Sequence, residues 1–166
     1  MMERVSVFWH SPFLIIILLF QYMSDTYDLQ RFVEAQDPVY RDVVSELENG
    51  RKTSHWMWFI FPQVNGLGSS YMAKKFAVSS KKEAADYLEH PVLGSRLREC
   101  ATLVNAVDGR PALEIFGGID SAKFRSSMTL FANVTPENEI FKNALQKYFD
   151  GEPDNLTLER MNLWEQ

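Results

Sequence analysis

The stretch HWMWFIFPQVNGLGSS, residues 55–70, guides the interpretation of this whole chain. Its first half holds two of the four tryptophans together with Phe59 and Phe61, and Pro62 ends the apolar run. An aromatic ring removes on the order of 150–250 Å² from water when it is buried, so this segment is expected in the core. The polar, glycine-rich second half predicts a tight loop beside that aromatic wall. The junction of wall and loop is where we expect a ligand site.

The aromatic segment is predicted to form a helix of barely two turns, capped by Ser54 and ending at Ile60. It cannot run further, because the residue before Pro62 is disfavoured in α geometry. A buried strand is the alternative for so short an apolar run.

The spacing of apolar residues predicts helices on both sides of this segment. Upstream, Asp28 is expected to cap a short helix, and Asp37-Pro38 offers an N-cap followed by proline at the first helical position. Downstream, Ser80 and Glu83 form a capping box. Further helices are expected over about 92–109, 120–131 and 156–163, and another from Thr135-Pro136. We therefore predict an all-α fold: one compact domain, residues 23–166, of short and medium helices joined by tight turns.

Residues 1–22 differ from the rest of the chain. The apolar run from Phe13 to Phe20 is shorter than the roughly 20 residues that span a bilayer. It has the length of a signal-peptide core, yet no small-x-small cleavage site follows it. Three interpretations stay open: an over-extended reading frame with Met23 as the true start, a signal or membrane anchor, or a helix docked on the domain. A cytoplasmic protein is predicted, and a membrane-anchored or exported one is the alternative if this leader is genuine.

The composition, with 46% hydrophobic and 23% charged residues, is that of an ordinary globular protein. The net charge of −5 argues against a nucleic-acid partner, since general nucleic-acid binders are usually basic. The single cysteine, Cys100, excludes an internal disulfide and a cysteine-rich metal site, and its helical context predicts a core residue. The histidines lack zinc-ligand spacing, so neither a metal nor a cofactor is predicted. The sequence indicates no oligomeric state.

Several motifs resemble an uncharacterised family, the domain of unknown function 1810. The carrying motifs are DLQRF (28–32), HWMWFIFPQ (55–63), GLG (66–68), HPVLGSRL (90–97) and SSMTLF (126–131), together with Asp120 and Lys123. The resemblance covers about residues 28–163 and implies a compact, mainly helical domain, but no established reaction. Automated annotation sometimes labels the family calpastatin. True calpastatins are long, disordered inhibitors, whereas this chain is compact and aromatic-rich.

A polar group is predicted on the helix that starts near Asp120. Asp120, Lys123 and Ser127 are spaced three and four residues apart, so they share one helix face. Ser127 adjoins a run of apolar residues, and a hydroxyl buried there needs a hydrogen-bond partner from the protein or a ligand. Ordinary surface pairing is the alternative interpretation of Asp120 and Lys123.

The other polar candidates also have two interpretations each. His55 could act as a general base, because a free imidazole titrates near 6.5, or could simply bond backbone at a helix end. His90 fits an N-cap position better than a catalytic one. The loop of Gly66, Gly68 and Ser69 could present backbone N–H groups to an anion, but a plain turn is the simpler interpretation.

Two functional classes follow. In the first, the protein binds or hydrolyses a small nucleotide-like or phosphorylated ligand, such as one with an N-glycosidic or ADP-ribosyl bond. A tryptophan, Trp56 or Trp58, would stack on a flat ring, and Lys123 or Arg51 would meet a phosphate. The expected site residues are catalytic His55 and Asp120, and ligand-binding Trp58, Gln63, Ser69, Lys123 and Ser127. In the second class the protein is a non-catalytic interaction or structural module whose aromatic residues are core.

Overall fold

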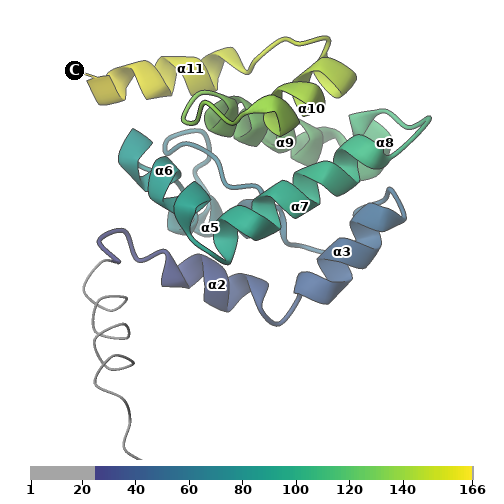
Figure 1. Ribbon diagram of the computed structural model, residues 1–166, viewed down its shortest axis with the longest axis horizontal. Helices are drawn as coiled ribbons and strands as arrows, with labels where there is room; N and C mark the ends of the chain where they lie inside the picture. The colour runs from purple at the N-terminus through teal and green to yellow at the C-terminus, as the bar shows by residue number, and fades with distance from the viewer. Residues whose placement is uncertain (1–24, 166) are drawn as a thin grey trace, which may run out of the picture. The chain divides into compact units, whose positions relative to one another are not determined.

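The computed structural model describes residues 25–165, and the leader predicted at residues 1–22 lies outside this range. Within it the chain forms ten α-helices and a 3₁₀ helix (Figure 1). They are α2 (Gln30–Gln36), α3 (Tyr40–Glu48), α4 (Met57–Ile60), α5 (Tyr71–Lys75), α6 (Lys81–Glu89), α7 (Leu93–Ala106), α8 (Ala112–Phe116), α9 (Gly118–Ala132), α10 (Glu139–Phe149), α11 (Asn155–Asn162) and η1 (Leu163–Glu165). Across these residues the only β-type pairing is an isolated bridge between Val64 and Val78. The all-α prediction is confirmed, and the strand alternative is wrong.

Two long helices, α7 and α9, organise residues 31–165. The first packs against α3, α6 and α10, the second against α8, α10 and α11, and the short α4 touches both. In Figure 1, α7 runs between α3 on one side and α9 and α10 on the other. Every residue of α9 from Ser126 to Ala132 is buried. This half of α9 is covered on all sides, so its polar side chains must find partners inside the protein.

The rotation of α9 is fixed by an aromatic cluster around Phe124. The ring of Phe124 lies 4.9 Å from that of Phe61, which follows α4, and 4.8 Å from that of Phe116 on α8. All three side chains are buried. Ring contacts of this kind stabilise by about 0.5–1.5 kcal/mol beyond the area they bury. They hold the second turn of α9 next to the segment that follows α4.

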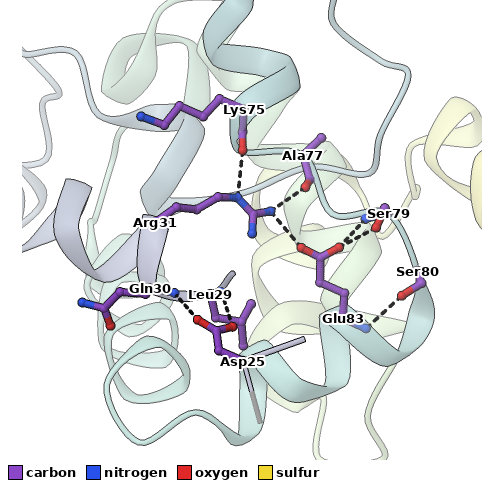
Figure 2. Close-up of polar contacts among 9 residues, drawn as sticks. All are labelled: Asp25, Leu29, Gln30, Arg31, Lys75, Ala77, Ser79, Ser80 and Glu83. Carbon is purple, nitrogen blue, oxygen red and sulfur yellow. Dashed lines mark hydrogen bonds and ion pairs between the residues drawn. The ribbon is translucent and has the colours of Figure 1, made fainter. Parts of the chain in front are cut away.

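The N-terminal cap of α2 is Asp25, so the predicted cap at Asp28 is wrong. The Asp25 carboxylate accepts hydrogen bonds from the backbone N–H groups of Leu29 at 2.5 Å and Gln30 at 3.0 Å (Figure 2). Asp28 has a φ of 52°, in the left-handed region, where aspartate is tolerated better than most residues. The backbone turn before α2 places the Asp25 carboxylate at the start of the helix.

The predicted cap at Ser54 is also wrong. Helix α4 starts at Met57, and its N-cap Trp56 makes no side-chain cap bond. The hydroxyl of Ser54 instead donates to Glu46 on α3 at 2.5 Å, because an ionised carboxylate is a stronger acceptor than a neutral oxygen. Two other helices begin later than predicted: α3 at Tyr40 and α10 at Glu139, each after a turn that includes the expected proline.

The capping box at the start of α6 is confirmed. The Ser80 hydroxyl accepts the backbone N–H of Glu83 at 3.0 Å. The Glu83 carboxylate reaches back one residue further than predicted: it accepts the N–H of Ser79 at 2.8 Å and pairs with Arg31 at 2.8 Å (Figure 2). The Arg31 guanidinium also donates to the carbonyl oxygens of Lys75 and Ala77. Helix α2, residues 75–79 and helix α6 are thereby tied together by one buried ion pair.

Cys100 is a core residue, as predicted. Its side chain is fully buried on α7, and burial raises the pKa of the thiol to about 12. A thiol with so high a pKa is inert at neutral pH, because the thiolate is the reactive form.

Candidate functional site

Four of the described residues form a compact polar group where α9 begins, which we call the Asp120 cluster: Lys52, Trp58, Asp120 and Lys123. One carboxylate oxygen of Asp120 lies 2.7 Å from the Lys52 ammonium, and the other lies 3.0 Å from that of Lys123. Lys52 belongs to the segment between α3 and α4, and its backbone N–H donates to Ile115 on α8 at 2.7 Å. The cluster therefore joins residues from separate parts of the chain.

The carboxylate of Asp120 is held in its ionised form. Burial alone would raise its pKa, but the hydrogen bonds and positive charges of Lys52 and Lys123 outweigh burial and lower the pKa. Its position in the first turn of α9 favours the anion further, since the positive end of the helix dipole lies there. At neutral pH Asp120 is thus an acceptor and an anion, and cannot serve as a proton donor.

Lys52 is unusually buried for a lysine, with only 8% of its side chain exposed. An ammonium group has three donors, and among the described residues Lys52 has one ionic acceptor, Asp120. Its remaining contact is with the ring of Trp56, whose centroid lies 5.2 Å from the ammonium. Ring faces attract cations but accept no conventional hydrogen bond, so Lys52 keeps donor capacity that a ligand oxygen could use.

The two tryptophans of the aromatic segment have different environments. Trp56 is 1% exposed and belongs to the core. Trp58 is only partly buried, and the Lys123 ammonium lies 4.7 Å from its ring centroid. Of the two, Trp58 is the one whose side chain is partly exposed.

Glu46 on α3 holds in place the chain between Lys52 and Trp56. Its carboxylate accepts four hydrogen bonds, from the Thr53 and Ser54 N–H groups, the Ser54 hydroxyl and the indole N–H of Trp56. Partial burial alone would raise the pKa of Glu46, but these bonds lower it from the ordinary 4.5 to about 2. They fix the chain on both sides of His55 and therefore the approach of Lys52 and Trp56.

This arrangement predicts an acid-sensitive contribution to stability. Because the native pKa of Glu46 is depressed, its contribution is complete above pH 4.5 and is lost as the pH falls toward 2. The difference in unfolding free energy between the wild type and Glu46→Gln should shrink through this window, measured by urea unfolding at a series of pH values. Glu48→Gln is the matched control, since the Glu48 carboxylate makes no polar contact with any described residue. A difference that stays constant with pH would contradict the assignment.

Ser127 lies two turns beyond Asp120 on α9, and the environment of its hydroxyl is unusual for a polar group. The side chain is fully buried, and its oxygen has no hydrogen-bond partner among the described residues. Its neighbour Ser126 lies within hydrogen-bond distance of Ala122 and Asp154. An unpaired buried hydroxyl costs on the order of 1–3 kcal/mol. Ser127 shares a helix face with Asp120 and Lys123, so unfilled hydrogen-bond capacity exists on this face as well.

The loop half of the predicted site makes other contacts. The Gln63 carbonyl accepts the N–H of Val78 at 2.8 Å, and the Gly66 backbone lies against the guanidinium of Arg160 on α11. Ser69 is exposed, and the neighbouring Ser70 caps α5. Within residues 25–165 no hydrogen bond, ion pair or ring contact links Gln63 or Ser69 to the Asp120 cluster.

The two histidines beyond the leader differ in their roles. His90 accepts the backbone N–H groups of Val92 and Leu93 through Nδ1, each at 3.2 Å, so it caps the start of α7 as its sequence position predicts. His55 is exposed, and its side chain makes no polar or ring contact with the described residues. The structure thus brings Trp58, Asp120 and Lys123 together, and no polar or ring contact among the described residues joins His55 to them.

Sequence reasoning missed Lys52 and Glu46. Lys52 stands next to Arg51, the residue chosen as a phosphate contact, and no periodicity distinguishes two adjacent cations in a loop. Glu46 lies between the buried Val43 and Leu47 on α3, where a solvent-facing carboxylate is the ordinary expectation. Only the fold shows which acidic and basic side chains point at the tryptophans.

Two features are absent from the described residues. In the part of the chain that the structure describes, no helix combines the length and the apolar character needed to cross a membrane. Residues 25–165 also contain no group of three or more His, Cys, Asp or Glu side chains that could hold a metal ion.

Fold and site together define a small all-α domain that carries a lysine-rich cluster beside a partly exposed tryptophan. The chain belongs to the family described as "Protein of unknown function (DUF1810)", whose model matches residues 26–161. It is similar to a solved structure, the crystal structure at 1.38 Å of the conserved hypothetical protein Rv1873 from Mycobacterium tuberculosis. The two share 54% sequence identity and a TM-score of 0.82, over 83% of this chain and 99% of the other. No curated protein matches the chain significantly.

Proposed function

We propose that this protein binds a small anionic ligand with a planar ring, of a nucleotide-like or phosphorylated type, at the Asp120 cluster. The observation that carries the proposal is the pairing of two lysines with one carboxylate beside a partly exposed tryptophan. Two ammonium groups against one carboxylate leave an excess positive charge, which attracts an anion. The open part of the Trp58 ring offers a stacking surface, and base–aromatic stacking contributes about 1–3 kcal/mol.

The buried, incompletely bonded groups support the same proposal. Lys52 is costly to bury unless its charge is used, and Asp120 satisfies only part of its donor capacity. Ser127 adds a buried hydroxyl without a partner on the same helix face. A ligand oxygen near these groups would supply the missing hydrogen bonds. Binding would then remove part of the free-energy cost of burying these polar groups without partners in the free protein.

We propose that the protein binds this ligand but does not hydrolyse it. Hydrolysis of a glycosidic bond needs a proton donor for the leaving group. The lowered pKa of Asp120 keeps it ionised at neutral pH, so it could act only as a base or as an electrostatic partner. His55 would have to be the donor, and none of its contacts in the described residues directs it toward the cluster.

The test is a thermal-shift screen of the full chain against aromatic anions at millimolar concentration, with adenosine 5′-monophosphate as the first probe. Lys123→Met should abolish the ligand-induced shift, because losing a charge-assisted hydrogen bond removes about 1.5–3 kcal/mol of binding. The same change should cost the free protein less than about 1 kcal/mol, as expected for a partly exposed ion pair.

Lys142→Met is the matched control for this screen. Lys142 is exposed on α10 and makes no ion pair within residues 25–165, so the variant should keep the full shift. A wild type that responds to no planar anion would refute the proposal. A Lys123→Met protein that loses much of its stability would assign Lys123 a structural role instead.

A second candidate function, a non-catalytic interaction module, is favoured by exposed apolar side chains beside the cluster. Ile119 is 77% exposed and Leu113 is 61% exposed, and Gly118 brings the backbone between them close to Leu113. Isolated exposed apolar residues are normal on protein surfaces, so two of them support a partner surface weakly. A negative ligand screen combined with self-association that Ile119→Ser removes would favour this second candidate.

A further inference from the structure

We infer that Asp120 sets the charge of the ligand, so that the site takes a planar-ring compound with a single negative charge. This inference rests on the proposed function and narrows its ligand class. The two cations of the cluster, Lys52 and Lys123, each contact a different oxygen of the same carboxylate. One of the two positive charges is therefore balanced within the protein, and one is left for the ligand.

The geometry allows a ligand to add to this arrangement without displacing Asp120. Each lysine ammonium has three N–H donors, and each has one carboxylate oxygen as its ionic acceptor among the described residues. A ligand oxygen can therefore bond to Lys123, which is 22% exposed, while Asp120 keeps its place. The Trp58 indole then limits where the ligand ring can lie, because Lys123 is already positioned over that indole.

The other charged groups near the cluster form no ion pair with its lysines in the described structure. The Glu46 carboxylate directs its oxygens at four N–H and O–H donors and forms no ion pair with either lysine in the described structure. Arg51, next to Lys52 in the chain, is exposed and has no ionic partner within residues 25–165, so solvent screens its charge. Asp120 is thus the carboxylate that contacts both lysines directly, and substituting it changes the charge they offer most.

The experiment uses three ligands that share one ring and one sugar but differ in charge: adenosine, adenosine 3′,5′-cyclic monophosphate and adenosine 5′-monophosphate. Above the second phosphate pKa of about 6 they carry close to zero, one and two negative charges. Affinities are measured by isothermal titration calorimetry on the full chain. The wild type is expected to bind the singly charged ligand most tightly.

Two variants move the charge balance in opposite directions. Asp120→Asn leaves both lysine charges unbalanced, so preference should move toward the doubly charged ligand by roughly tenfold, equivalent to about 1.4 kcal/mol. Lys123→Met removes the excess charge, so both charged ligands should lose their advantage over adenosine. Lys142→Met should leave all three affinities unchanged. Urea unfolding of each variant shows whether it is folded, and if Asp120→Asn is not, Lys123→Met decides alone.

The possible results separate this inference from the proposed function. A wild type that binds, together with variants whose ligand preference is unchanged, overturns the role of Asp120 and leaves the binding site standing. Equal weakening of all three ligands in Asp120→Asn also overturns it, because Asp120 would then contact the shared ring or sugar. If none of the three ligands binds to the wild type or to either variant, the proposed function fails and the inference fails with it.

Discussion

Glu83→Ala is expected to lower the free energy of unfolding by about 3–5 kcal/mol, the usual cost of removing one partner from a buried ion pair. The Glu83 side chain is 3% exposed and that of Arg31 is 15% exposed, so the change removes the carboxylate from a largely buried ion pair. The same change removes the acceptor of Ser79. Chemical unfolding in urea, followed by circular dichroism, measures the loss.

A control for this prediction lies one turn further along α6. Asp86 pairs with Lys82 at 3.0 Å, but the Lys82 side chain is 72% exposed, so Asp86→Ala should cost less than about 1 kcal/mol. The double change Arg31→Met with Glu83→Leu should recover part of the loss, since no charge then stays buried without a partner. A loss below about 1 kcal/mol for Glu83→Ala would mean that Arg31 reaches solvent when its partner is removed.

Trp56→Ala should be comparably damaging, with a loss of about 3–5 kcal/mol. Its indole is 1% exposed, it lies against Phe61, and its N–H donates to Glu46 at 2.9 Å. Substitution by alanine leaves a large cavity and removes one of the four donors to that carboxylate. Trp56→Phe keeps most of the ring volume and should cost clearly less. Both are measured by urea unfolding, with near-UV circular dichroism to confirm that the core stays packed.

Trp58→Ala is the matched comparison, because it removes the same side chain two residues along the same segment. Trp58 is partly exposed, so its loss should be clearly smaller than that of Trp56. Equal losses for the two substitutions would show that Trp58 is as much a core residue as Trp56. That result would also weaken its assignment as a stacking surface.

Three of the residues expected at the site, Trp58, Asp120 and Lys123, are in contact in the structure. Asp120 and Lys123 could be placed together from the sequence, since their spacing puts them on one face of α9. Their contact with Trp58 could not, because it depends on how α9 is rotated against α4. The roles of these residues in binding stay predictions.

For the loop half of the expected site, closeness in sequence does not lead to a contact with the Asp120 cluster within residues 25–165. Gln63 and Ser69 directly follow the aromatic segment, yet Pro62 redirects the chain, and the backbone after it pairs with residue 78. Lys52, which precedes the segment, entered the cluster instead, because its backbone is fixed to Ile115 and its ammonium is drawn to Asp120.

The sequence by itself determined the all-α class, the capping box at Ser80, the cap at His90 and the burial of Cys100. These features depend on local spacing and on bonds between residues a few positions apart, which the chain specifies without its tertiary partners. Only the tertiary structure decided which aspartate caps α2, which tryptophan is core and which lysine meets Asp120. In each case two similar residues compete for one position, and their difference in free energy comes from contacts with segments distant in sequence.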